Sequence, residues 1–183
     1  AKRAELLAVL ELARRALAPR VAALTDIDLH AYLPADAQDL VSLQKAVMAV
    51  EMTRSLSHER IQHGQQLSER LRALFAEGGA ISGADHAANL ARTQRARSGV
   101  DALFDQVDAV LAPSSTGVAP AGISATGDPL FCRGWTLMGL PCVHLPFTQG
   151  QGGLPVGLQL VGSRCDDLRL LALCFILGVT SWT

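Results

Sequence analysis

Two adjacent serines, Ser114 and Ser115, are the residues of this 183-residue sequence whose position most suggests nucleophilic chemistry. They follow an apolar run over 108–113, and loops after strands often carry catalytic groups. A serine nucleophile needs a nearby histidine, or a lysine with a lowered pKa, to take its proton. The sequence holds only two lysines, Lys2 and Lys45, both in predicted helices far from the pair. We therefore favour a turn in which the hydroxyls bond the backbone, and keep a hydrolase that uses Ser114 or Ser115 as an alternative.

The imidazoles, thiols and carboxylates do not combine into a second candidate site. No His-Glu-x-x-His or Cys-x-x-Cys spacing occurs, so we expect ordinary core or surface histidines and reduced, buried thiols. Asp101, Asp105 and Asp108 can share a helix face, but without an oxygen-rich loop a solvated face is favoured over a metal site. Asp166 and Asp167 are interpreted as a helix start. The sequence predicts no metal and no cofactor. The histidines and cysteines are His30, His58, His63, His86, His144, Cys132, Cys142, Cys165 and Cys174.

Composition and charge exclude several classes of protein. With 16 basic and 17 acidic residues the net charge is −1, which excludes a basic nucleic-acid-binding footprint. Hydrophobic residues make up 49 % and charged residues only 18 %, an apolar balance for a soluble domain. The longest apolar run, Leu170 to Val179, is about half of the roughly 20 residues that a membrane span needs. The sequence begins with Ala1, without Met or an apolar signal segment, so we expect a cytoplasmic protein whose numbering starts inside a longer gene product.

The elements that would position these residues change in character near residue 98. Residues 1–98 hold four of the 16 glycines and two of the 8 prolines, and apolar residues at helical spacing predict a mainly helical part. We expect one helix ending near Pro19, one from Asp36, one that stops at Gly78-Gly79, and one running from Ser82 to about residue 106. Ser82 and Asp85 resemble a capping box. A weak alternation over 21–33 predicts a short strand.

Residues 99–183 hold most of the glycine and proline and predict an α/β part. A strand over 108–112 precedes a loop over 114–127. A helix over 128–138 follows, with Asp128 as its N-cap and Pro129 at its first position. Strands over 142–147 and 154–161 form a predicted hairpin, and a last helix covers 168–177.

Several motifs in this second part resemble the C-terminal part of an amidase signature family enzyme. They are Asp-Ala-Val-Leu-Ala-Pro-Ser at 108–114, Thr-Gly-Asp-Pro-Leu-Phe at 126–131, Trp-Thr-Leu-Met-Gly-Leu-Pro-Cys at 135–142 and Leu-Pro-Val-Gly-Leu-Gln-Leu-Val-Gly at 154–162. The last run is the most specific. The resemblance implies an α/β fold in which this chain is a fragment, a partial mixed β-sheet with flanking helices, and 1–98 and 99–183 together form one incomplete domain.

The resemblance implies hydrolysis of a carboxamide C–N bond through an acyl-enzyme. In such enzymes a serine attacks, a second serine in a cis peptide relays its proton to a lysine, and backbone N–H groups hold the oxyanion. The serines lie in a Gly-Gly-Ser-Ser-Gly-Gly-Ser type of signature, which is absent here, and no lysine fits the base. Ser114 and Ser115 match the Pro-Thr strand end of the family instead. No catalytic residue is therefore expected in this chain, and the chain alone is expected to be inactive.

The helix over 128–138 is the candidate wall of the substrate pocket. The resemblance places this segment beside the pocket, and Phe131 and Trp135 are four residues apart on one helix face. Core packing is the alternative for both rings, and helix capping is the alternative to substrate contact for Asp128. Thr136 stands where many members have Asn, so a polar role of that Asn does not carry over.

The predicted parent protein is a cytoplasmic amidase acting on a small-molecule amide, with no nucleic-acid or membrane partner. The alternative is a non-catalytic, amidase-like binding or interaction module. Because part of the core is expected to lie outside this sequence, a strand edge and an apolar face should be exposed. We therefore also expect a homo-oligomer formed through exposed apolar surface.

Overall fold

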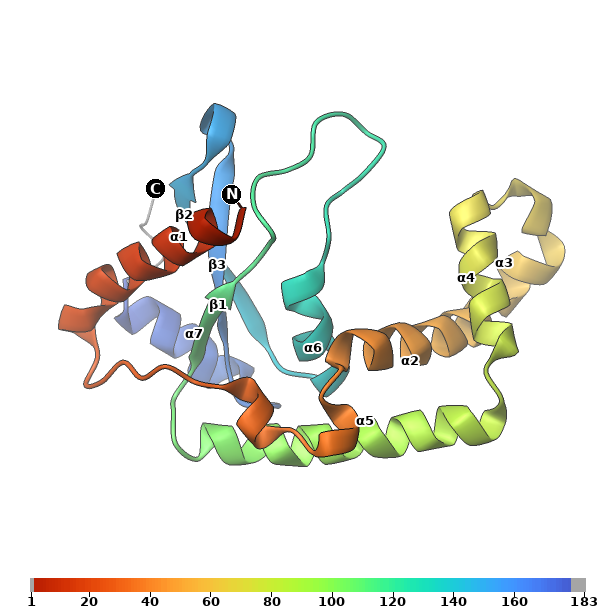
Figure 1. Ribbon diagram of the computed structural model, residues 1–183, viewed down its shortest axis with the longest axis horizontal. Helices are drawn as coiled ribbons and strands as arrows, with labels where there is room; N and C mark the ends of the chain where they lie inside the picture. Colours follow the sequence, from red (N-terminus) through yellow and green to blue (C-terminus); the bar gives the residue numbers. More distant parts are fainter. Residues whose placement is uncertain (1, 179–183) are drawn as a thin grey trace.

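Three strands form an antiparallel sheet in residues 2–178, the part of the chain that the structure, a computed structural model, describes (Figure 1). The strands are β1 (Val110–Pro113), β2 (Cys142–Gln149) and β3 (Pro155–Val161), in the order β1–β3–β2. The helices are α1 (Lys2–Leu17), α2 (Leu40–Ser55), α3 (Ser57–Gln62), α4 (Glu69–Ala80), α5 (Gly83–Phe104), α6 (Leu130–Met138) and α7 (Asp167–Ile176). The α/β class is confirmed. Both strand pairs are antiparallel, so the described sheet is not mixed as the resemblance implied.

The two faces of the sheet belong to different parts of the core, because alternate residues of a strand point to opposite sides. On β3, Leu158 packs with residues of α1, and Leu160 packs with Leu170 of α7. Val161 points the other way and packs with residues of α2, α5 and α6, among them Trp135. Figure 1 shows α1 and α7 on one side of the sheet and α2 and α6 on the other. The sheet therefore joins two layers of helices.

The predicted hairpin is confirmed: β2 and β3 pair antiparallel, with a register shift between Pro146 and Thr148. The first helix and the last helix are also confirmed as α1 and α7. Val179, which ends the apolar run, and Ala1 lie outside the described residues. Among residues 2–178, every helix is too short or too polar to cross a membrane.

The strand predicted over 21–33 is wrong. The segment contains a short 3₁₀ turn, Leu29–Tyr32, which starts where the Asp28 carboxylate accepts a hydrogen bond from the His30 amide at 3.0 Å. The turn lies against α5, where a Cβ on Gly99 would overlap the Tyr32 carbonyl oxygen. A local side-chain hydrogen bond and this close packing replace strand pairing, for which no described strand is adjacent.

The start predicted for the long helix is displaced by one turn. α2 begins at Leu40, and Asp39 rather than Asp36 caps it, accepting a hydrogen bond from the Ser42 amide at 2.9 Å. The Asp36 carboxylate forms an ion pair with Arg95 of α5 instead. Asp36 and Asp39 are both of a residue type that caps helices. Asp39 caps α2, whereas Asp36 pairs with α5.

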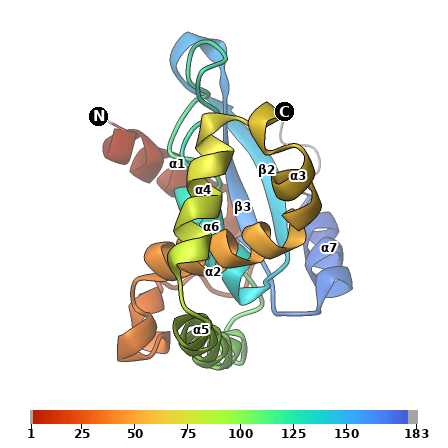
Figure 2. The same cartoon turned by 90° about the vertical axis from the view of Figure 1, so that its right-hand side faces the viewer.

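The predicted helix stop at Gly78-Gly79 is also wrong. α4 continues through both glycines to Ala80 and packs on α2 (Figure 2). A Cβ on Gly78 would overlap the carbonyl oxygen of Ala49, so this glycine permits a close approach of two helices rather than a helix end. The following capping interaction is confirmed, because Ser82 Oγ accepts a hydrogen bond from the Asp85 amide at 3.1 Å.

Candidate functional site

The carboxyl end of β1 and the first turn of α6 meet at the buried side chain of Gln159. Its Nε2 donates to the Pro113 carbonyl at 2.8 Å and to the Phe131 carbonyl at 3.0 Å. One amide therefore fixes the loop over 114–127 at both of its ends. No role for Gln159 was expected from the sequence, although it lies in the run Leu-Pro-Val-Gly-Leu-Gln-Leu-Val-Gly that was the most specific part of the resemblance.

The serine pair at this junction has no base. Ser115 Oγ donates to the Gly117 carbonyl at 2.8 Å, which is the turn interaction expected for it. The Ser114 amide continues the β1–β3 pairing by donating to the Gly157 carbonyl at 3.3 Å. Ser114 Oγ is buried and has no hydrogen-bond partner among the described residues. A nucleophilic serine would need a proton acceptor at this oxygen, so the turn is the better interpretation.

His144 lies on β2 beside Gly157 of β3, near this junction. A Cβ on Gly157 would overlap the imidazole ring of His144, so the ring covers the glycine on the face of the sheet. Gly157 is also the residue that accepts the Ser114 amide. No hydrogen bond joins the ring to Ser114 Oγ, because that oxygen has no partner in the described part of the chain. The two residues flank one glycine without forming a nucleophile–base pair.

The three candidate pocket residues lie along α6 in different environments. Trp135 is buried in the core cluster that includes Leu33 and Met138. Phe131 is half-buried one turn earlier, and Asp128 is exposed just before the helix. The structure therefore places two of the three at the N-terminal end of α6, beside the Gln159 junction, and Trp135 behind them. Their contact with a substrate stays a prediction.

The expected cap by Asp128 is wrong. α6 begins at Leu130 with Pro129 as its N-cap residue, and this residue makes no side-chain capping hydrogen bond. Asp128 Oδ1 lies instead 4.0 Å from Arg133 Nε. The Arg133 Nη1 donates to Gln44 Oε1 of α2 at 2.8 Å, and this side chain is mostly buried. The carboxylate of Asp128 is held toward a cation and remains exposed to solvent.

Two of the four thiols, Cys142 and Cys174, are poor nucleophiles. Partial burial of the sulfur, and next the nearby Cys132, raise the pKa of Cys142 to about 11. Burial also raises the pKa of Cys174. Since the thiolate is the reactive form, both thiols are protonated near neutral pH. All four cysteines are free thiols.

Residues 2–178 contain no group of three or more His, Cys, Asp or Glu side chains that could hold a metal ion. His58 and His63 approach each other edge to face, with ring centroids 5.8 Å apart, on the exposed helix α3 and its C-terminus. A pair of imidazoles alone leaves a metal ion short of ligands.

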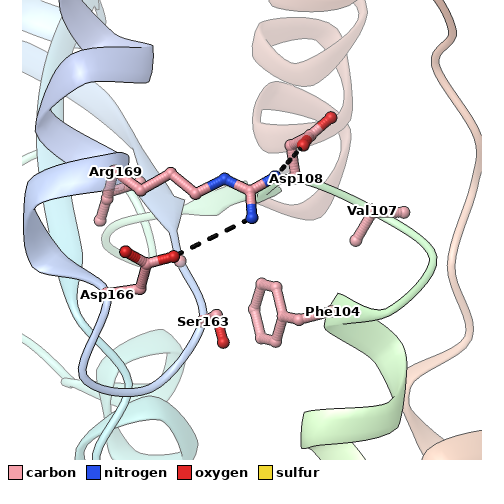
Figure 3. Close-up of a pocket in the computed structure, with 8 residues that line it drawn as sticks. Phe104, Val107, Asp108, Ser163, Asp166 and Arg169 are labelled. Carbon is pink, nitrogen blue, oxygen red and sulfur yellow. Dashed lines mark hydrogen bonds and ion pairs between the residues drawn. The ribbon is translucent and has the colours of Figure 1, made fainter.

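The aspartates at 101 and 108 form ion pairs with the C-terminal segment, and their carboxylates stay in contact with solvent. Asp101 pairs with Arg164, and Asp108 pairs with Arg169, each at 2.5 Å. Figure 3 shows Arg169 between Asp108 and Asp166, above a cavity beside Phe104 and Ser163. The cavity has a volume of about 10 Å³, near the minimum for one water molecule. The ion pair of Asp108 with Arg169 links α7 to the segment that follows α5. The cavity is too small for a substrate.

A larger open groove, of about 510 Å³, lies between α2 and α4. Lys45 and Ser68 both line it, so a lysine and a serine share this groove. Ser68 Oγ is occupied as the N-cap of α4, accepting a hydrogen bond from the Leu71 amide at 3.3 Å. Among the described residues, no hydrogen bond joins Ser68 Oγ to the Lys45 side chain, so the groove does not supply Ser–Lys chemistry.

A model of the amidase family matches residues 11–171, which is most of the chain. This chain is a member of the amidase signature family. Curated proteins that it is similar to are the glutamyl-tRNA(Gln) amidotransferase subunits A of Cupriavidus taiwanensis and Bdellovibrio bacteriovorus, at 37 % identity over 75 residues and 33 % over 81 residues. These matches cover 37 % and 40 % of this chain but only 15 % and 16 % of those proteins.

Solved structures show that the amidase fold extends over nearly all of the chain. A crystal structure of an amidase superposes with a TM-score of 0.82 at 22 % identity, over 97 % of this chain and 42 % of the other. A bacterial aryl acylamidase of the amidase signature family gives a TM-score of 0.73 at 20 % identity, over 98 % and 41 %. The chain thus spans about two-fifths of the amidases that share its fold.

Proposed function

We propose that this chain is the C-terminal part of an amidase that hydrolyses a carboxamide C–N bond through a Ser–Ser–Lys acyl-enzyme mechanism. The catalytic residues would lie upstream, outside this sequence. The observation that carries the proposal is the family match over residues 11–171. In addition, the hydrogen bonds of Ser68, Ser114 and Ser115 in the described part of the chain include none to a lysine or histidine base. The chain would supply structure to the site and no reacting group.

The part supplied would be a wall of the substrate pocket. Asp128 and Phe131 lie at the end of α6 that Gln159 ties to β1, so their backbone positions are fixed by a buried hydrogen-bonded residue. Trp135, buried behind them, would set the position of this wall rather than its surface. In this proposal residues 1–98 and 99–183 form one incomplete domain, and the substrate is a small-molecule amide.

The experiment is an ammonia-release assay with a panel of small carboxamides, on the chain alone and on the chain extended by the sequence encoded directly upstream. We expect no turnover by the chain alone and turnover by the extended protein. Turnover by the chain alone, lost in Ser114→Ala or Ser115→Ala, would contradict the proposal and restore the serine-pair hydrolase. In the extended protein, Phe131→Ala should raise KM more than it lowers kcat, because an apolar wall binds ground state and transition state alike.

A non-catalytic interaction module is the second candidate. The observation that favours it is that described residues already pack against both faces of the sheet. The reading frame upstream of Ala1 separates the two candidates. A Gly/Ser-rich signature with a preceding lysine supports the amidase, whereas a start codon at this position supports the module.

A further inference from the structure

Gln159 is the polar residue of β3, a strand whose other residues are apolar or glycine. It lies on the central strand of the described sheet, opposite Ala112 of β1 and His144 of β2, and is only 4 % exposed. Its neighbours Leu158 and Leu160 both belong to hydrophobic clusters. Burying an amide is unfavourable unless its polar atoms are hydrogen-bonded. A glutamine at this position is therefore explained by its hydrogen bonds and not by apolar packing.

The amide nitrogen of Gln159 is chemically suited to join two carbonyl groups, because it carries two N–H donors and no charge. One donor binds the Pro113 carbonyl at the end of β1, and the other binds the Phe131 carbonyl in the first turn of α6. A lysine or an arginine could also donate twice, but it would bring a charge into this buried site. The side chain is thus a neutral link between the end of a strand and the start of a helix.

The C-terminal half of α6 is held by other residues. Arg97 of α5 donates from Nη2 to the Leu137 carbonyl at 2.9 Å. Gly134 packs closely on Leu40 of α2, where an added Cβ would lie 3.1 Å from the Leu40 Cδ1. Both contacts are independent of the sheet. Loss of the Gln159 link should therefore displace the first turn of α6 and leave the rest of the helix in place.

The first turn of α6 is held to β1 mainly by Gln159. Its N-cap residue, Pro129, makes no side-chain capping hydrogen bond. The Cys132 thiol also reaches the end of β1, with Sγ 3.5 Å from the Ser114 carbonyl oxygen, but a thiol is a weak donor. Phe131, a residue of the candidate pocket wall, lies in this turn, and its own carbonyl is the one that Gln159 binds.

We propose that Gln159 is a positioning residue for substrate binding, which holds the first turn of α6 and Phe131 in place before the substrate arrives. This role rests on the proposed function, in which this turn is a wall of the pocket. A wall that is already ordered loses less entropy on binding, so the link increases the affinity for the substrate. Gln159 acts through the wall and not on the amide bond that reacts, so its loss should change KM rather than kcat.

The first measurement is amide hydrolysis by the chain extended by the sequence encoded directly upstream. Gln159→Met keeps an unbranched side chain of similar length and removes both donors. We expect this variant to raise KM at least about fivefold and to leave kcat within about twofold. Gln159→Asn keeps the amide on a side chain one methylene shorter and should raise KM less. Gln149→Met, at an exposed position of β2, is the matched control and should change neither constant.

The second measurement reports on the junction without any catalysis. Maleimide labelling of the half-buried Cys132 is followed by mass spectrometry in a background in which the exposed Cys142 and Cys165 are replaced by serine. Gln159→Met should accelerate this labelling at least about fivefold, because the first turn of α6 would separate more often from β1. Cys174, buried between α7 and the sheet, is the internal control for unfolding of the whole chain, and its labelling should accelerate less.

The possible results distinguish this role from the proposed function. If the unmodified extended protein turns over no amide, the proposed function is overturned, and the role in substrate binding with it. If that protein is active but Gln159→Met leaves KM unchanged, or lowers kcat alone, the positioning role is overturned and the proposed function stands. Equal acceleration of labelling at Cys132 and Cys174 would show that the substitution loosens the whole fold, and would also overturn the positioning role.

Discussion

The side-chain amide of Gln159 should stabilise the fold through the two carbonyls that it holds. In Gln159→Leu, the Pro113 and Phe131 carbonyls lose their donor in a buried site, so the free energy of unfolding should fall by about 1–3 kcal/mol. Urea denaturation followed by circular dichroism measures this change. Gln94→Leu, at an exposed position of α5, is the control and should change stability by less than about 0.5 kcal/mol. Equal effects in the two variants would remove the structural role assigned to Gln159.

The cap of α2 predicts a dependence of stability on acid. The backbone and hydroxyl hydrogen bonds from Ser42 lower the pKa of Asp39 from its ordinary value of 3.8. Because the folded pKa is the lower one, the carboxylate stabilises the fold above the unfolded pKa, and this stabilisation is lost as pH falls through the folded pKa. Asp39→Asn keeps an acceptor oxygen but cannot titrate. Its stability should therefore fall less than that of the unmodified chain below about pH 4.

The measurement for this cap is the free energy of unfolding at a series of pH values from 2 to 6. Asp36, whose pKa is lowered mainly by its hydrogen bond with Arg95, remains in both proteins. The difference between the two curves therefore reports Asp39 alone. Parallel curves for the two proteins would show that the cap does not couple to protonation.

What the sequence predicts of individual residues depends on how far their partners lie along the chain. The capping role of Ser82 was predictable because its partner, the Asp85 amide, is three residues away. The role of Gln159 was not, because the carbonyls that it bonds lie 46 and 28 residues away. Asp128 shows the reverse error: it has the residue type of an N-cap, but the helix starts without it and Arg133 holds it.

Whole elements were likewise predictable where their signals are local in the sequence, and not where they depend on distant contacts. α1, α7 and the β2–β3 hairpin were predicted because their apolar spacing and flanking turns are local features. The segment over 21–33 alternates weakly, yet a strand requires a neighbouring strand that this part of the chain does not meet. Gly78 reads as a helix end in the sequence, and only the packing of α4 on α2 shows that it is a contact point.

The two neighbouring glycines of α4 provide a matched pair of variants for this packing. Gly78→Ala should destabilise the fold by about 1–3 kcal/mol, because the new methyl group would overlap the Ala49 carbonyl and force the helices apart. Gly79→Ala meets nothing within 4 Å and should stabilise by about 0.5–1 kcal/mol through helix propensity alone. Thermal unfolding of the two variants measures both changes. Stabilisation by both would show that Gly78 makes no close contact with Ala49 of α2.

At the scale of the whole molecule, β3 is the strand that packs against both layers of helices, so we expect the chain to unfold as one cooperative unit. Its side chains alternate between the α1 and α7 layer and the α2, α5 and α6 layer, so neither layer keeps its packing without the strand. The helical part up to residue 98 contributes to both layers, through α1 on one side and α2 and α5 on the other. We therefore expect the change in composition near residue 98 to mark no boundary in stability.

A substitution on one side of the sheet tests this expectation with a reporter on the other side. Leu158 is fully buried against α1, whereas Trp135 is buried in the layer across the sheet. In a Trp182→Phe background Trp135 is the one tryptophan that remains. Leu158→Ala should lower stability by about 2–5 kcal/mol and shift the urea midpoints of Trp135 fluorescence and of circular dichroism equally. Leu154→Ala, at an exposed position, should shift both midpoints little. A fluorescence midpoint unmoved by Leu158→Ala, beside a lowered dichroism midpoint, would show that the two layers unfold separately and that this chain contains two units rather than one.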